Sequence, residues 1–161
     1  MAAGKSTIGR ALARKLNKNF YDTDAEITKG TGVAISLIFE LEGENGFRKR
    51  ETGKLKQLSE IKNSIIATGG GTVLSVENRE VLKKTGHIIY LECSVAQQLK
   101  RTKYDTVRPL LKVKNPRLKL EELMRVRAPI YESLADILIN TEKPSSKHVI
   151  DKIIRQLEEI A

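Results

Sequence analysis

Apolar residues recur along this chain at two alternating spacings, one typical of helices and the other of extended strands. Helical spacing begins at Ile8 and continues through Leu12 to Leu16, and residues 17–19 are expected to close that helix. Further helices are predicted over 25–41, 44–61 and 148–160, and extended runs over 20–22, 64–67, 87–91 and 135–139. Helices that alternate with short apolar strands predict a parallel α/β sheet with helices on its faces.

Glycine and proline divide this pattern at several places. Gly30, Gly32 and Gly43 are expected to break the helices of residues 23–61, which would form an insertion over the sheet edge. Pro109 and Pro116 lie in a basic stretch, about 103–116, that predicts an irregular segment between two helices. Neither a linker nor a repeat divides the chain, so residues 1–161 are expected to form a single domain.

Composition narrows the classes of protein that need to be considered. No stretch approaches the roughly 18 apolar residues of a membrane span, and the start has no apolar export signal. The lone cysteine, Cys93, suits a reducing compartment, so a cytoplasmic protein is expected. The net charge of +9 fits binding to nucleic acid, to acidic partners or to small anions. Only 4% of the residues are aromatic and none is tryptophan, so few side chains could stack on the bases of a nucleic acid.

Ala3-Gly4-Lys5-Ser6-Thr7 matches the second half of a phosphate-binding P-loop, G-x-x-x-x-G-K-[ST]. In such loops backbone N–H groups approach phosphates, the lysine reaches the β and γ phosphates, and the hydroxyl ligates magnesium. The first loop glycine and the strand before it would lie upstream of Met1. We therefore expect this exact chain to be poorly stable or inactive, and a chain that starts about ten residues earlier to be the working enzyme.

Two aspartates follow the first predicted strand. Asp22 and Asp24 are two residues apart, so on an extended backbone both side chains would face one site. In phosphoryl transfer one such group helps to hold magnesium while another orients or deprotonates the attacking hydroxyl. The alternative is that Asp24 merely caps the helix that starts near Ala25.

Several arginines are candidates for binding anions. Arg48 and Glu51 are three residues apart on a predicted helix, so the Glu51 carboxylate could hold the Arg48 guanidinium in place. A fixed guanidinium can bind the carboxylate of a substrate. The alternative is an exposed surface pair, which has the same spacing. Arg108 precedes Pro109, which favours an extended backbone and a side chain free to reach a nucleotide. Arg127 precedes Ala128-Pro129, where the helix is expected to break or kink, and Arg101 could stack on a base.

The run Gly69-Gly70-Gly71 directly follows an apolar strand. Three consecutive glycines indicate unusual dihedral angles or a close approach to a ligand, although a plain tight turn is the alternative. Because open α/β sheets bind ligands at the carboxyl ends of their strands, a binding role is favoured.

Six blocks of sequence, taken together in their order along the chain, resemble shikimate kinase, a P-loop small-molecule kinase family. The resemblance spans the whole chain. The blocks are Ala3-Gly4-Lys5-Ser6-Thr7-Ile8-Gly9-Arg10, Asp22-Thr23-Asp24, Gly46-Phe47-Arg48 with Glu51, Thr68-Gly69-Gly70-Gly71, Thr106-Val107-Arg108-Pro109-Leu110-Leu111 and Arg127-Ala128-Pro129-Ile130-Tyr131. The resemblance implies a three-layer fold with a normally five-stranded parallel sheet, its first strand missing here, and a lid at about 103–116.

The resemblance also implies a function, which is transfer of the γ-phosphoryl group of ATP to the 3-hydroxyl of shikimate, with Mg²⁺ as cofactor, in a monomer that binds neither nucleic acid nor membrane. Its implied ATP-binding residues are Ala2, Ala3, Gly4, Lys5, Ser6, Thr7, Arg101, Arg108 and Lys143, with Ser6 and Asp22 at the metal. Its implied shikimate-binding residues are Asp24, Arg48, Gly69, Gly70, Gly71 and Arg127, and its implied catalytic residues are Asp24, Lys5 and Arg108.

Rival interpretations stay open at this point. Within the same fold, a gluconate or nucleotide kinase is the nearest alternative, although Arg48 and Arg127 favour an acceptor with a carboxylate and Asp24 favours one with vicinal hydroxyls. From other classes, a noncatalytic kinase-like binding protein or a basic nucleic-acid module would share the composition.

Overall fold

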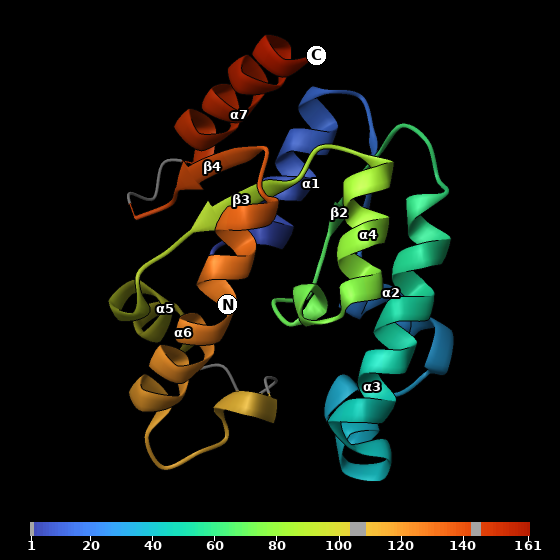
Figure 1. Cartoon of the computed structure of the whole chain (residues 1–161), viewed down its shortest axis with the longest axis vertical. Helices are drawn as coiled ribbons and strands as arrows, with labels where there is room; N and C mark the ends of the chain where they lie inside the picture. The colour runs from blue at the N-terminus through green and yellow to red at the C-terminus, as the bar shows by residue number, and fades with distance from the viewer. Residues whose placement is uncertain (1, 104–108, 143–145) are drawn as a thin grey trace.

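The computed structural model describes residues 2–103, 109–142 and 146–161 (Figure 1). The first half of the chain contains α1 (Lys5–Lys15), β1 (Asn19–Asp22), α2 (Thr23–Thr31), α3 (Ile35–Ser59), β2 (Ser64–Ala67), the 3-10 turn η1 (Thr72–Leu74) and α4 (Val76–Thr85). The second half contains β3 (Ile89–Glu92), α5 (Val95–Thr102), the 3-10 turn η2 (Pro109–Leu111), α6 (Pro116–Leu134), β4 (Ile137–Asn140) and α7 (Ser146–Ile160).

The strands form two parallel pairs, which confirms the predicted α/β class. β1 pairs with β2 in a register that ends at Asp22 and Ala67, and β3 pairs with β4 in a register that ends at Glu92 and Asn140. Within the described residues, no ladder of hydrogen bonds joins one pair to the other. Because the strands of a parallel pair end on the same side, the segments after β1 and β2 emerge together.

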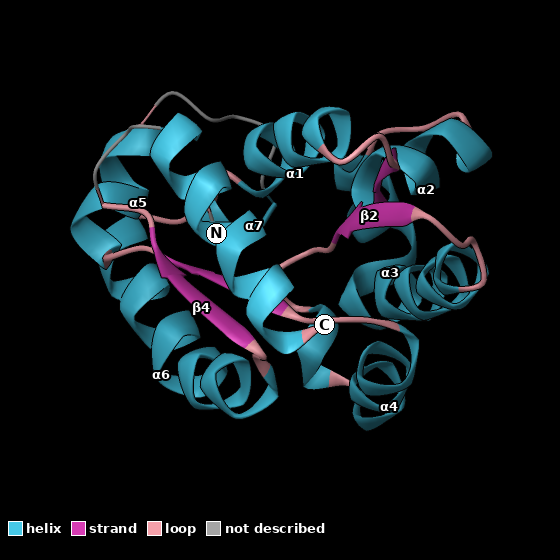
Figure 2. Cartoon of the chain, turned by 90° about the horizontal axis from the view of Figure 1, so that it is seen from above, coloured by secondary structure: helices cyan, strands magenta, loops and turns pink. Residues whose placement is uncertain are grey.

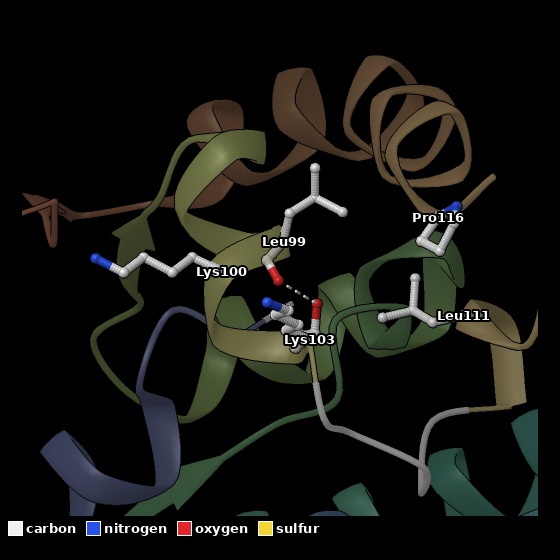
Figure 3. A pocket seen from close by; sticks show the side chains of 6 residues that line it. Leu99, Lys100, Lys103, Leu111 and Pro116 are labelled. Atoms are coloured by element: carbon white, nitrogen blue, oxygen red, sulfur yellow. Dashed lines mark hydrogen bonds between the residues drawn. The ribbon is translucent and has the colours of Figure 1, made fainter.

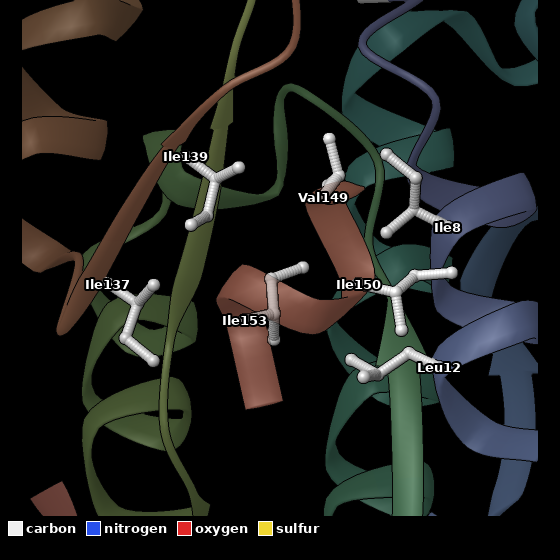
Figure 4. Close-up of a cluster of buried hydrophobic side chains, with 7 residues drawn as sticks. All are labelled: Ile8, Leu12, Ile137, Ile139, Val149, Ile150 and Ile153. Atoms are coloured by element: carbon white, nitrogen blue, oxygen red, sulfur yellow. The ribbon is translucent and has the colours of Figure 1, made fainter. Parts of the chain in front are cut away.

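A cluster of aliphatic side chains fills the space between the two strand pairs (Figure 4). Figure 4 shows α7 between β4 and α1, with its apolar face turned toward both. The buried members are Ile8, Leu12, Ile137, Ile139, Val149, Ile150 and Ile153. Ile65 of β2 and Ile89 and Leu91 of β3 pack against the cluster, so both strand pairs share this core.

Helices cover both faces of the strands, as the view from above shows (Figure 2). In β3, Ile89 and Leu91 point to the cluster with α1 and α7, whereas the Tyr90 ring lies 4.9 Å from the ring of Tyr131 on α6. This alternation is the period of two expected of a strand that is covered on both sides.

Two of the three predicted glycine breaks are present in the helices after β1. Gly32 ends α2 with φ of 73°, and Gly43 interrupts α3 with φ of 70° and ψ of −179°. Both dihedral pairs lie in regions that side chains with a Cβ avoid. Gly30 is different, because it lies inside α2.

The prediction for Pro129 was wrong in one respect. A helix was expected to break or kink near Arg127, which would place this side chain close to a helix end. Instead α6 continues through Pro129 to Leu134, and Arg127 lies within it at 3% exposure. Proline has a helical φ, although it removes one backbone donor and crowds the carbonyl four residues earlier. Arg127 and Tyr131 of the same helix contact the glycine run, which favours the continued helix.

Candidate active site

One cleft of about 660 Å³ gathers the predicted site residues from both halves of the chain. Its lining includes Ala2, Ala3, Gly4, Lys5, Ser6, Thr7, Asp22, Asp24, Arg48, Glu51, Gly69, Gly70, Gly71, Arg101 and Arg127. Two predicted residues, Arg108 and Lys143, lie outside the described residues. The predicted residues that the structure describes therefore converge on one place.

The loop before α1 has the geometry of a phosphate-binding turn. Gly4 is the N-cap of α1 with φ of 89°, and Ala2 has φ of 50°, so a residue with a Cβ occupies left-handed backbone there. The first turn of α1 starts with Lys5, Ser6 and Thr7 at the cleft, where its backbone N–H groups have no partner within the helix. Such a helix start attracts anions.

Asp22 connects this loop to the strand that follows α1. The Ser6 hydroxyl donates a 2.5 Å hydrogen bond to Asp22 Oδ2. Asp22 Oδ1 accepts from the backbone N–H groups of Asp24 and Ala25, at 3.1 and 3.2 Å, and so caps α2. The cap role considered for Asp24 therefore belongs to Asp22. A hydroxyl beside a carboxylate is a set of hard oxygen ligands that suits Mg²⁺.

Asp24 lies in the first turn of α2 and faces the cleft. Burial, with the nearby charges of Asp22 and Glu51, raises the pKa of Asp24 from 3.8 to about 6, although Lys5 and Arg48 act in the opposite direction. Its Oδ1 atom is buried and has no hydrogen-bond partner among the described residues. A carboxylate of this kind is suited to accept a proton near neutral pH.

Arg48 is held by a chain of buried polar groups. Arg48 Nη1 donates to Glu51 Oε2 at 2.8 Å, and Glu51 is fully buried. The Thr72 hydroxyl donates to the other Glu51 oxygen at 2.7 Å, and Asn78 Nδ2 donates to the Thr72 carbonyl at 2.9 Å. Burial opposes the charged guanidinium, but Glu51 and Glu44 keep the pKa of Arg48 above its usual value. The alternative of an exposed surface pair is therefore wrong.

The glycine run after β2 lies between the two arginines. The Gly69 N–H donates to the Thr23 hydroxyl at 3.2 Å, and the Tyr131 hydroxyl donates to the Gly70 carbonyl. A Cβ on Gly70 would lie 3.3 Å from Arg127 Nη1, and one on Gly71 would lie 2.3 Å from Arg48 Nη2. The run is glycine because both guanidinium groups approach its backbone closely.

Arg127 carries the second unsatisfied polar atom of the cleft. Its Nε is buried without a hydrogen-bond partner among the described residues, as is the Oδ1 atom of Asp24. Leaving such an atom unpaired costs about 1–3 kcal/mol, and more where the group is charged. A ligand with an anionic group and a hydroxyl would satisfy both atoms.

Arg101 reaches the loop from α5. Its Nη2 donates to the Thr141 carbonyl at 2.8 Å, and its Nη1 donates to the Ala2 carbonyl at 3.0 Å. The side chain therefore ties the end of β4 to the phosphate-binding turn. The predicted contact of Arg101 with adenine stays a prediction.

Sequence reasoning assigned no role to two residues that hold the site in place. Tyr131 fixes the Gly70 peptide from α6, and Thr72 fixes Glu51 from η1. Thr72 is adjacent to the glycine run and Tyr131 follows Arg127 by one helical turn, but neither position carries a local signal of these long-range contacts.

A second cavity of about 470 Å³ lies beside α5 and the start of α6 (Figure 3). It is lined by Leu99, Lys100, Thr102, Lys103, Leu111 and Pro116. None of the predicted site residues lines it, so the chemistry belongs to the larger cleft.

A parallel α/β fold whose first helix starts with Gly-Lys-Ser and opens onto such a cleft defines a P-loop kinase. Comparison with known proteins identifies the kind of kinase. The model of the shikimate kinase family matches residues 1–158. A shikimate kinase of Methylococcus capsulatus is 51% identical over 158 residues, which is 98% of this chain and 88% of that protein. This chain belongs to the shikimate kinase family.

Solved structures agree with the family match. Shikimate kinase from Acinetobacter baumannii, in complex with shikimate, is similar with a TM-score of 0.97 at 44% identity, over 99% of this chain and 89% of that one. Shikimate kinase from Aquifex aeolicus has a TM-score of 0.86 at 40% identity, over 98% of this chain and 92% of that one.

The described residues contain no helix with the length and apolar character that a membrane span requires.

Proposed function

We propose that this chain transfers the γ-phosphoryl group of ATP to the 3-hydroxyl of shikimate, as a step of aromatic amino acid biosynthesis. The observation that carries this proposal is the pair of buried, unpaired atoms in one cleft, Asp24 Oδ1 and Arg127 Nε. Shikimate offers a hydroxyl to the first and a carboxylate to the second. The relative from Acinetobacter baumannii, whose structure contains shikimate, supports this choice of acceptor.

On the nucleotide side, the loop from Ala2 to Thr7 would hold the phosphates. The N–H groups at the start of α1 face the phosphate oxygens, and Lys5 neutralises the charge that builds between the β and γ groups. Arg101, Arg108 and Lys143 complete the binding of ATP in this proposal. Residues 103–116 are the proposed lid, of which 104–108 lie outside the described residues.

Mg²⁺ would lie next to Ser6, with Asp22 behind it. The 2.5 Å contact between the Ser6 hydroxyl and Asp22 Oδ2 already puts two oxygen ligands side by side. When bound next to Ser6 and Asp22, the ion would offset the negative charge of the phosphates. The chain itself contributes the position of the hydroxyl, which Asp22 fixes because it also caps α2.

On the acceptor side, the insertion of residues 23–61 would form much of the binding surface. Arg48 and Arg127 clamp the shikimate carboxylate from opposite sides of the glycine run, and Gly69, Gly70 and Gly71 offer their backbone. Asp24 orients the attacking hydroxyl and accepts its proton, for which a pKa of about 6 is well placed. Phosphoryl transfer needs positioning and charge more than covalent help from the protein.

We further infer that the protein acts as a monomer in the cytoplasm and binds neither nucleic acid nor membrane. The net charge of +9 then serves two anionic substrates. Cys93, a free thiol at 3% exposure, is compatible with a reducing compartment.

A coupled assay of ADP release tests the proposal. The protein is mixed with ATP, Mg²⁺ and shikimate, and gluconate replaces shikimate as the control acceptor. We expect release that depends on shikimate and is reduced at least a hundredfold in D24N, because that variant cannot accept the proton. ADP release with gluconate but not shikimate would assign the chain to another kinase. Folded protein without turnover, both in this chain and in one that starts about ten residues earlier, would point to another acceptor or a binding role.

A further inference from the structure

The Arg48 guanidinium is bound by two carboxylates of its own helix. Glu51 accepts from Nη1 at 2.8 Å. Glu44 Oε1 accepts from Nη2 at 3.0 Å and from Nε at 3.3 Å. The chain therefore places one of its own carboxylates on the side edge of this guanidinium.

The two carboxylates differ in how firmly they are fixed. Glu51 is fully buried, and its second oxygen is bound by the Thr72 hydroxyl. Glu44 is 46% exposed at its side chain. Water can solvate Glu44 at little cost if it leaves Arg48, whereas Glu51 has no such replacement. Glu44 is thus the exchangeable partner.

The edge that Glu44 uses is also the best edge for a substrate. A guanidinium offers a carboxylate two parallel N–H donors either at its end, Nη1 with Nη2, or at its side, Nε with Nη2. Glu51 binds one N–H of Nη1, so the side pair is the fork that Glu51 does not touch. Other parts of the chain lie close to the Arg48 guanidinium. Gly71 lies against it, and the Phe47 ring centroid is 5.2 Å from Arg48 Cζ.

We propose that Glu44 is an internal stand-in for the substrate carboxylate, which occupies the Nε–Nη2 fork of Arg48 until the substrate replaces it. This inference rests on the proposed role of Arg48 in binding shikimate. Displacing Glu44 breaks two hydrogen bonds to its Oε1 atom, and a planar carboxylate that uses both oxygens would replace them with two parallel bonds. Glu44 therefore lowers affinity for the correct acceptor slightly and rejects neutral or weakly paired ligands more strongly.

The chain offers a matched control on the same helix. Glu42 binds the same edge of Arg50, although it uses both oxygens, with Oε2 accepting from Nε at 2.9 Å and Oε1 from Nη2 at 2.6 Å. Glu42 is 38% exposed, which is similar to Glu44, whereas Arg50 is 43% exposed against 21% for Arg48. Arg48 lines the cleft and Arg50 does not. E42Q and E44Q change the net charge equally, so a difference between them reports on Arg48 and not on general attraction of anions.

The test measures shikimate binding by calorimetry, and the KM values for shikimate and ATP, in the wild type, E44Q, E44A and E42Q. We expect E44Q and E44A to bind shikimate about two- to fivefold more tightly, with an unchanged KM for ATP and stronger competitive inhibition by acetate. E42Q should match the wild type.

Two outcomes would contradict the inference in different ways. Equal or weaker shikimate binding by E44Q and E44A, with a wild type that phosphorylates shikimate, would overturn the inference alone and make Glu44 a support for Arg48. A wild type that neither binds nor phosphorylates shikimate would overturn the proposed function, and the inference with it.

Discussion

The Ser6 hydroxyl and the Asp22 carboxylate are joined by a 2.5 Å hydrogen bond, although Ser6 belongs to α1 and Asp22 to the end of β1. The other Asp22 oxygen caps α2, the helix that carries Asp24. One carboxylate therefore fixes both the proposed metal position and the start of the helix with the proposed base.

Substitution of Asp22 should separate these two tasks. Asparagine is a good N-cap, so D22N keeps the cap but loses the charge. We expect D22N to unfold at the same urea concentration as the wild type and to need about 10- to 100-fold more Mg²⁺ for half-maximal activity. D22A loses the cap as well and should be about 1 kcal/mol less stable. A wild-type Mg²⁺ requirement in D22N would remove Asp22 from the metal site.

The raised pKa of Asp24 predicts how the activity depends on pH. A base with a pKa of about 6 in the free protein is protonated below that value. We expect kcat/KM for shikimate to fall tenfold per pH unit below about pH 6 and to level above it. The measurement is a pH profile of kcat/KM at saturating ATP and Mg²⁺. A profile that is flat from pH 5 to 7 would exclude Asp24 as the base.

The raised pKa of Asp24 also predicts how the stability of the folded protein depends on pH. Because folding raises this pKa from 3.8 to about 6, the ionised carboxylate is disfavoured in the folded protein. The resulting destabilisation is absent below about pH 4, grows as the pH rises to about 6, and then stays constant at up to about 3 kcal/mol. D24N should therefore be more stable than the wild type in urea at pH 8 but not at pH 4. An equal difference at both pH values would contradict this origin.

Tyr131 should act on the acceptor side only. Y131F removes the hydroxyl that donates to the Gly70 carbonyl but keeps the ring. Loss of one such bond should raise the KM for shikimate about two- to tenfold, with little effect on the KM for ATP. Y90F is the control, because Tyr90 contacts Tyr131 through its ring, which that change preserves. Equal effects of Y131F on both KM values would indicate a general loss of structure.

Gly71 should tolerate no side chain. In G71A the new Cβ would meet Arg48 Nη2 at 2.3 Å and force the guanidinium away, so we expect shikimate binding to weaken about 10- to 100-fold while ATP binding persists. G53A is the control on α3, where a Cβ meets nothing within 4 Å. Alanine there should stabilise the protein by about 0.5–1 kcal/mol in urea unfolding. Wild-type shikimate binding by G71A would show that Arg48 has another position.

The elements of this fold were largely readable from the sequence because each has a strong local pattern. The runs predicted at 64–67 and 87–91 became β2 and β3 within two residues. Pro129 misled the prediction because a proline inside a helix costs one hydrogen bond, and tertiary contacts made by Arg127 and Tyr131 outweigh that cost.

The site was only partly readable, for a related physical reason. Arg48 and Glu51 are three residues apart on one helix, so their pairing follows from helical geometry. The contact of Tyr131 with Gly70 joins residues 61 positions apart, and that of Thr72 with Glu51 joins residues 21 apart. Such contacts depend on how helices pack over the strands, which no local pattern contains.

The position of α7 has a consequence for the temperature dependence of the site. In the described part of the chain the two strand pairs share no ladder, and they meet in the aliphatic cluster that Val149, Ile150 and Ile153 of α7 complete. Backbone hydrogen bonds hold each pair together. The joint between the pairs has the Arg101–Ala2 and Tyr131–Gly70 hydrogen bonds, but its core consists of apolar contacts, which weaken on cooling. Cold should therefore loosen the joint before it loosens either pair, and the loop at Lys5 would then lose its alignment with Arg127 while both halves stay folded.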